Sequence, residues 1–101
     1  MRILVVEPGK QPEEREIDGS LESMQQIVGG LIQAIYPFDD TVALICNDEG
    51  KLLGLPWNRV VGYDIIAGTF FLCDAPLDSE NFEGLRVDQI RRYSSIFTVM
   101  N

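Results

Sequence analysis

The sequence predicts an α+β fold: a small, mostly antiparallel sheet of about five strands with two helices packed on it. Short apolar runs rich in β-branched residues are separated by turn residues, which is the pattern of antiparallel strands. Two other segments repeat their apolar residues every three to four positions, as amphipathic helices do. The chain has 101 residues, of which 46% are hydrophobic and 24% charged, so we expect a single domain spanning residues 1–101.

The N-terminal part predicts a hairpin followed by a helix. Residues 2–6 form an apolar run that ends in a Glu-Pro-Gly turn, and residues 13–17 return as a short edge strand. Ser20 can cap a helix whose apolar positions 21, 24, 27 and 28 share one face. Gly29-Gly30 is expected to end this helix in the left-handed conformation. It is not expected to bind phosphate, because it follows a helix instead of opening one.

The middle of the chain predicts more antiparallel strands. Residues 31–36 stop at Pro37, and residues 41–47 are rich in apolar and β-branched side chains. The turn 48–51 is predicted to join this strand to another at 51–55, with Gly50 at positive φ. The second part of the stretch 63–73 is predicted to be a central strand. Gly68 is expected to mark a bulge or a close approach of backbones there.

The C-terminal part predicts a surface loop and a second helix. Residues 74–84 contain Pro76 and several acids, so we expect a loop. Beyond this loop, apolar residues recur at helical spacing and predict a helix that packs on the sheet: Val87, Ile90, Tyr93 and Phe97.

Net charge and cysteine content limit the classes of partner and the cellular location that we expect. A net charge of −8, with only 8 Lys and Arg residues, argues against DNA or RNA as a partner and suits a basic protein. Cys46 and Cys73 lie too far apart for a redox pair, and each sits in an apolar run, so we expect both to be buried and reduced. No apolar run approaches the ~18 residues of a membrane span. We therefore expect no membrane partner and a cytoplasmic location.

Catalytic chemistry has few candidate residues. The chain has no histidine, so it lacks the usual general base and the commonest metal ligand. Adjacent acids such as Asp39-Asp40 are typical of solvated turns, and we expect no metal site and no cofactor. The expectation is a protein that is not an enzyme.

The most informative stretch is Pro56-Trp57-Asn58-Arg59, because Lys51 is the only other cation between Arg15 and Arg86. Arginine offers a planar fork that fits a phosphate, asparagine can bind a base edge, and an aromatic ring can stack on a base. Alternatively, Arg59 pairs internally with Asp64 or Asp40, and the aromatic rings are structural. The candidate ligand-binding residues are Tyr36, Asn47, Trp57, Asn58, Arg59, Gly68 and Thr69.

Blocks occurring in order along most of the chain resemble an uncharacterised family, domain of unknown function 3846; they span residues 24–30, 35–40, 42–50, 53–59 and 63–71. Members occur in bacteriophages and bacterial mobile elements. The resemblance therefore implies a phage-borne or mobile-element accessory protein in the cytoplasm of a bacterial host. The family has no assigned activity. Two features depart from its pattern: the interval from Arg59 to Tyr63 is short, and Arg86 stands where a helix-capping Ser or Thr is expected.

Two hypotheses follow, from different classes. In the first, the protein is a non-catalytic binder that sequesters a small nucleotide-derived ligand, a signal of host immunity. A domain of this size needs a second copy to enclose such a ligand, so we expect a homo-oligomer. In the second, it is an acidic interaction protein that occludes the basic surface of a host defence or DNA-binding protein. Salt separates the two, because binding to a basic surface weakens steeply as salt rises.

Overall fold

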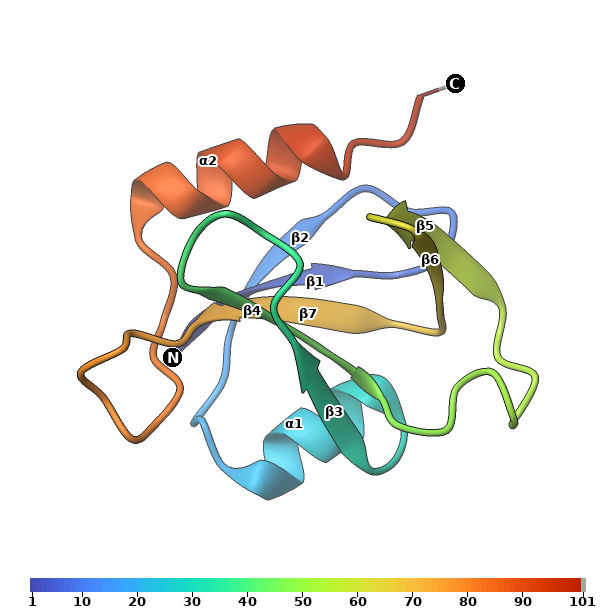
Figure 1. Ribbon diagram of the computed structural model, residues 1–101, viewed down its shortest axis with the longest axis horizontal. Coiled ribbons are helices and arrows are strands. Elements are labelled where there is room, and N and C mark those ends of the chain that lie inside the picture. Colours follow the sequence, from blue (N-terminus) through green and yellow to red (C-terminus); the bar gives the residue numbers. More distant parts are fainter. Residues whose placement is uncertain (101) are drawn as a thin grey trace.

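The computed structural model describes residues 1–100; Asn101, the last residue of the predicted domain, lies outside the described residues. Seven strands and two helices follow one another along the chain (Figure 1): β1 (Arg2–Val6), β2 (Glu13–Glu16), α1 (Leu21–Val28), β3 (Ile32–Ile35), β4 (Val42–Asn47), β5 (Trp57–Val61), β6 (Asp64–Ala67), β7 (Phe70–Asp74) and α2 (Val87–Ile96). The predicted α+β class is confirmed.

The main sheet has five strands in the order β2-β1-β7-β4-β3, and every neighbouring pair is antiparallel. β7 lies at its centre, as predicted. Leu72 of β7 is paired with Leu4 on one side and with Leu44 on the other, so the first and last strands are direct neighbours. The remaining strands, β5 and β6, form a separate two-stranded sheet.

Both faces of the main sheet are buried, and the two helices lie on opposite faces (Figure 1). Successive residues of a strand point to opposite faces. In β1, for example, Ile3 and Val5 pack with α1, while Leu4 and Val6 pack with α2 and the β5–β6 sheet. This explains why the central strands are continuous apolar runs in the sequence rather than alternating ones.

The ends of α1 follow the predicted capping. The Ser20 hydroxyl accepts a hydrogen bond from the Ser23 backbone N–H at 3.1 Å, and Gly29 ends the helix at φ 78°. At α2, Gln89 takes over the capping that was expected of a Ser or Thr. Its side-chain oxygen accepts from the backbone N–H of Arg86 at 2.8 Å, which satisfies a donor at the helix start.

The predicted strand at 51–55 is wrong, and so is the positive φ of Gly50. Residues 48–54 form consecutive turns, and Gly50 is not among the glycines at positive φ. A Cβ atom on Gly50 would lie 2.7 Å from the carbonyl oxygen of Ala67. Gly50 is therefore required for a close approach of two backbones rather than for a left-handed turn. The chain next pairs in β5–β6, a hairpin that was not predicted.

Gly68 is closely approached, but by a side chain and not by a second backbone as expected. Gly68 has φ 84°, and a Cβ atom there would lie 2.7 Å from Cδ1 of Leu55. Cys46 and Cys73 are unlinked and buried, as predicted. Within residues 1–100 there is no helix of the length and apolar character that crossing a membrane requires.

Candidate functional site

Arg59 is bound on all sides by the protein itself. Its Nε and Nη2 donate to the carbonyl oxygen of Phe97 at 3.2 and 2.9 Å, and Nη2 also donates to that of Lys10 at 2.6 Å. Nη1 donates to the carbonyl oxygen of Glu7 at 3.4 Å and to Oδ1 of Asn58 at 2.8 Å. A guanidinium has five N–H donors, and these five contacts use all of them. Burial lowers the pKa of Arg59 from its ordinary value.

Asn58, which accepts one hydrogen bond from Arg59, donates two more to the backbone. Its Nδ2 donates to the carbonyl oxygens of Val6 and Gly68, each at 2.8 Å. We call Asn58, Arg59 and their acceptors the Arg59 clamp. It ties the end of β1, the loop after β1 and the end of α2 to β5, and it does so through neutral carbonyl groups.

The predicted alternative that Arg59 pairs with Asp64 or Asp40 is therefore wrong. Asp64 instead forms an ion pair with Lys51, and the hydrogen bond from Lys51 lowers the pKa of that carboxyl. Asp40 accepts a hydrogen bond from the hydroxyl of Tyr93 at 3.1 Å, and its Oδ2 forms an ion pair with Nη1 of Arg92 at 3.7 Å. Carbonyl oxygens satisfy the guanidinium in place of a carboxylate.

Three of the other candidate ligand-binding residues, Tyr36, Thr69 and Asn47, line three different cavities. Tyr36 is 60% exposed and lines a cavity beside residues 75–82, and Thr69 lines another beside Glu7 and Arg15. Asn47 lines a third. Trp57 is 63% exposed and is paired with Ala67 across the β5–β6 sheet. Gly68 is buried and joins Asn58 through its carbonyl oxygen. The structure thus unites Asn58, Arg59 and Gly68 but not the whole set.

The cavity of Asn47 has a volume of about 160 Å³ and lies between the turns after β4 and the strand β6. The Asn47 amide is already engaged, since Nδ2 donates to Val28 and Oδ1 accepts from the backbone N–H of Glu49. Gln33 and Lys51 add polar groups to the wall. Cys46 also lines it, and burial, together with Asp48 and Asp64, raises the pKa of its thiol.

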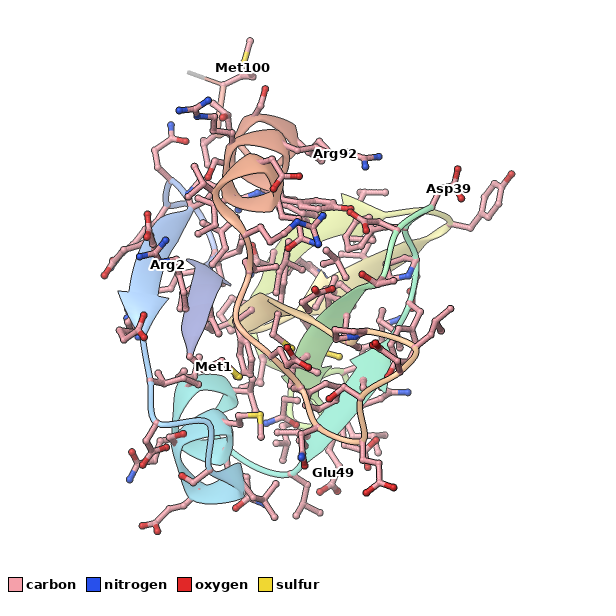
Figure 2. All side chains as sticks on the ribbon, turned by 90° about the vertical axis from the view of Figure 1, so that its left-hand side faces the viewer. Met1, Arg2, Asp39, Glu49, Arg92 and Met100 are labelled. Carbon is pink, nitrogen blue, oxygen red and sulfur yellow. The ribbon has the colours of Figure 1, made fainter. Side chains whose placement is uncertain are left out.

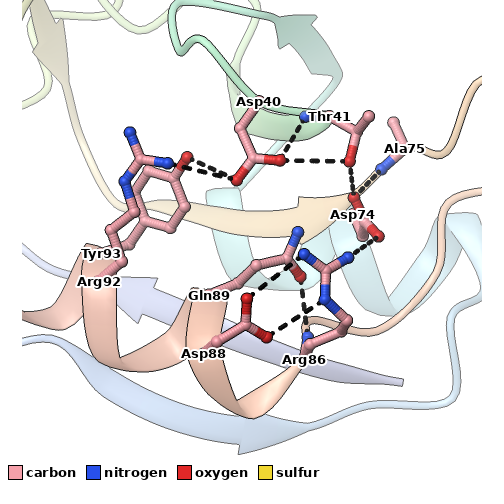
Figure 3. Close-up of polar contacts among 9 residues, drawn as sticks. All are labelled: Asp40, Thr41, Asp74, Ala75, Arg86, Asp88, Gln89, Arg92 and Tyr93. Atoms are coloured by element: carbon pink, nitrogen blue, oxygen red, sulfur yellow. Dashed lines mark hydrogen bonds and ion pairs between the residues drawn. The ribbon is translucent and has the colours of Figure 1, made fainter.

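A polar network joins α2 to the end of β7 (Figure 3). Asp74, which is buried, accepts a hydrogen bond from the hydroxyl of Thr41 and lies 3.7 Å from Arg86. Burial and the hydrogen bond to Asp40 raise the pKa of Tyr93 to about 12. The side-chain nitrogen of Gln89 is buried beside this network and has no hydrogen-bond partner among the described residues. Arg86 compensates the charge of Asp74, and Arg92 that of Asp40. The network therefore fixes α2 to the sheet.

An acidic groove with a volume of about 670 Å³ lies beside the N-terminus. Its carboxylates come from two loops, Asp18 before α1 and Glu80 and Glu83 after β7, and its apolar side chains are Met1, Met24 and Phe82. Hydrogen bonds from Ser20, then from Ser23, lower the pKa of Asp18 to about 2. The Met1 amine is engaged by Glu16 at 3.1 Å and by the carbonyl oxygen of Ile17 at 2.6 Å.

The sequence did not predict this groove, because its acids are far apart in the chain. The only signal was the net charge of −8, which indicates an acidic surface but not where it lies. Among residues 1–100, the carboxylates of Glu80 and Glu83 form no ion pair. The same residues contain no group of three or more Asp, Glu, Cys or His side chains that could hold a metal ion. The groove therefore presents separate negative charges above an apolar floor.

Comparison with known proteins identifies a family. A family model described as Domain of unknown function (DUF3846) covers residues 1–98 of the chain. No curated protein and no solved structure matches it.

Proposed function

The chain belongs to the DUF3846 family, and from that premise we propose that it is a non-catalytic interaction protein whose acidic groove receives a basic surface of another protein. The setting we propose is the one that the family resemblance implies. It is a phage or mobile-element accessory protein in the cytoplasm of a bacterial host, and its partner is a host defence or DNA-binding protein.

The observation that carries the proposal is the acidic groove. Lys and Arg side chains combine an apolar stem with a charged head. The floor of Met1, Met24 and Phe82 suits the stems, and the carboxylates at the rim suit the heads. Asp18, whose pKa is lowered to about 2 by hydrogen bonds from Ser20 and Ser23, is ionised at neutral pH. A net charge of −8 adds long-range attraction for a basic surface.

The test uses an arginine-rich peptide as probe and compares two double variants with the same change in net charge. Glu80→Lys with Glu83→Lys alters the groove, whereas Asp39→Lys with Glu49→Lys alters exposed acids outside it. Figure 2 shows Asp39 on the side of the molecule away from Met1. We expect calorimetry at low salt to show peptide binding that weakens as salt rises. The groove variant should lose at least about tenfold in affinity and the control variant much less.

Two results would count against the proposal. If both variants lose affinity equally, overall charge rather than the groove attracts the peptide. If the wild-type protein does not bind the peptide at low salt, the groove does not receive basic side chains at all.

The second candidate is the binder of a small nucleotide-derived ligand, and the cavity of Asn47 is the observation that favours it. Gln33 supplies an amide there, and Lys51, which is paired with Asp64 in the same wall, is the cation that would take the role expected of Arg59. At about 160 Å³ the cavity is smaller than the roughly 300 Å³ of a typical ligand site, so a second copy would have to complete it.

Cyclic dinucleotides and ADP-ribose are the probes for this candidate. Heat of binding and a raised melting temperature in the wild type, both lost in Lys51→Met, would support it. If the wild type shows neither heat nor a shift with these probes, the candidate fails.

A further inference from the structure

The two edges of the main sheet differ in their protection. β2 forms one edge and consists of Glu13, Glu14, Arg15 and Glu16, so a second strand that approached it would meet a row of charges. β3 forms the other edge with the sequence Ile-Gln-Ala-Ile, flanked by Leu31 and Tyr36, both of which are exposed. Charged side chains are a common means of preventing edge-to-edge pairing, and β3 has none.

The unpaired backbone groups of β3 can be assigned. The carbonyl oxygen of Leu31 accepts from the backbone N–H of Asp48 at 2.8 Å, which makes this a hydrogen-bonded pair across β3 and β4. Hydrogen-bonded pairs alternate along an antiparallel ladder, so Gln33 and Ile35 also face β4. The N–H and C=O groups of Ile32 and Ala34 therefore face outward. The same alternation, extended one residue past the end of β3, places those of Tyr36 outward as well.

The absence of charged residues along β3 indicates which partner suits this edge. No charged residue occurs between Glu22 and Asp39, although the whole chain carries a net charge of −8. A basic partner would find no carboxylate along β3. A second copy of the chain, which is repelled at most other surfaces, meets no like charge on this strand.

We propose that β3 pairs antiparallel with β3 of a second copy, so that the two five-stranded sheets join into one continuous sheet. Only residues with outward-facing groups can form hydrogen-bonded pairs across the new junction. A two-fold axis at Ala34 meets this condition and places Ala34 opposite Ala34 of the other copy. Ile32 then lies opposite Tyr36 of the other copy, an aliphatic and aromatic pair of the kind that stabilises neighbouring strands.

This pairing also bears on the cavity of Asn47. Gln33 lines that cavity, and the register described above places Ile35 of the second copy opposite Gln33. Each copy thereby adds an apolar side chain next to the cavity of the other. The cavity walls are completed by the same contact that joins the sheets.

The experiment is sedimentation velocity over a wide range of protein concentration, combined with amide hydrogen exchange. The mass should rise with concentration from 11.4 kDa toward twice that value. On association, the amides of Ile32, Ala34 and Tyr36 should become protected, while those of Gln33 and Ile35, already bonded to β4, change little. A dimer in which these three amides stay unprotected would place the interface elsewhere and overturn the proposal, as would a chain that stays monomeric at the highest concentration.

Variants give a second readout. Ala34→Pro removes an N–H that has no partner in β4, which an edge strand tolerates, and it should weaken association at least about tenfold. Should this variant fail to fold, Tyr36→Glu at the edge and Tyr63→Glu in the β5–β6 turn form a matched pair, since both tyrosines are exposed. Tyr36→Glu should weaken association and Tyr63→Glu should leave it unchanged. Equal effects of the two tyrosine variants would contradict the assignment of the edge.

Salt separates this proposal from the function proposed above. Each copy has a net charge of −8, so added salt should strengthen association of two copies by screening their repulsion. The same salt should weaken binding of an arginine-rich peptide to the acidic groove. Either result can fail while the other stands.

Discussion

The Arg59 clamp and the acidic groove are both polar regions that bring distant segments of the chain together, but the polar atoms of the clamp bind one another whereas Glu80 and Glu83 of the groove form no ion pair within residues 1–100. In the clamp, every donor of Arg59 meets an acceptor of the chain, and Asn58 completes the set. In the groove, Glu80 and Glu83 form no ion pair among the described residues and line an open volume. Polar residues that satisfy one another stabilise a fold, whereas those left facing solvent are available to a partner. The comparison predicts that substitutions in the clamp affect stability and substitutions in the groove affect binding.

Arg59→Ala should give the largest loss of stability. It removes a charged donor group from carbonyl oxygens in two separate segments, the loop after β1 and the end of α2, and we expect a cost of about 3 kcal/mol in the free energy of unfolding. Urea denaturation measures this directly. Arg59→Lys keeps the charge but loses the planar fork, so its stability should be intermediate. If Arg59→Ala unfolds with the free energy of the wild type, Arg59 does not stabilise the fold, and the contrast between the clamp and the groove is wrong.

Gly68→Ala should come next, and Gly54→Ala is its matched control. Both glycines have positive φ, at 84° and 69°, so both substitutions carry a backbone cost of about 1 kcal/mol. Only at Gly68 does the new Cβ meet another group, Cδ1 of Leu55 at 2.7 Å. Gly68→Ala should therefore lower the free energy of unfolding by about 1 kcal/mol more than Gly54→Ala. Equal melting temperatures for the two variants would show that Leu55 moves aside freely.

In the groove, Glu80→Lys combined with Glu83→Lys should leave the free energy of unfolding within about 0.5 kcal/mol of the wild type, because both side chains are exposed. The same thermal or urea measurement applies. A loss comparable to that of Arg59→Ala would mean that these acids stabilise the fold, and the contrast between the two regions would disappear.

The smallest effect concerns the acid titration of Asp18. Its pKa is lowered from 3.8 to about 2 by hydrogen bonds from Ser20 and Ser23, so its ionised form is favoured in the folded protein. The stabilising contribution is present above pH about 4 and is lost as the pH falls through about 2. Side-chain carboxyl NMR should show this midpoint, and Asp18→Asn should remove the associated pH dependence. An Asp18 midpoint near 4 would mean that the Ser20 hydrogen bond is weak in solution.

Much of the fold could be predicted because its signals are local. Ser20 and Gly29 mark both ends of α1, and the apolar spacing of residues 87–97 marks α2. One error lies where a glycine has a tertiary role. Gly50 was predicted at a left-handed turn, whereas its small size is required by the carbonyl of Ala67, which is distant in sequence.

The site was harder to predict than the fold. The sequence identified Asn58 and Arg59 as unusual residues, but their acceptors are backbone carbonyls, and every residue has one. No residue type distinguishes Glu7, Lys10 or Phe97 as the partner of a guanidinium. The acidic groove was missed for a similar reason, since Asp18 and Glu83 meet only after the chain has folded.

The pairing of β1 with β7 has a consequence for the order in which the protein assembles. Leu4 must meet Leu72 near the other end of the chain, and β7 is also the strand that joins the β1–β2 hairpin to the β3–β4 hairpin. During synthesis, the two hairpins emerge from the ribosome first and have no shared strand until residue 74 is released. We expect the sheet to close only after most of the chain has been translated, and such long-range closure slows folding. A nascent chain that stalls before β7 would expose the apolar strands β1 and β4 to chaperones.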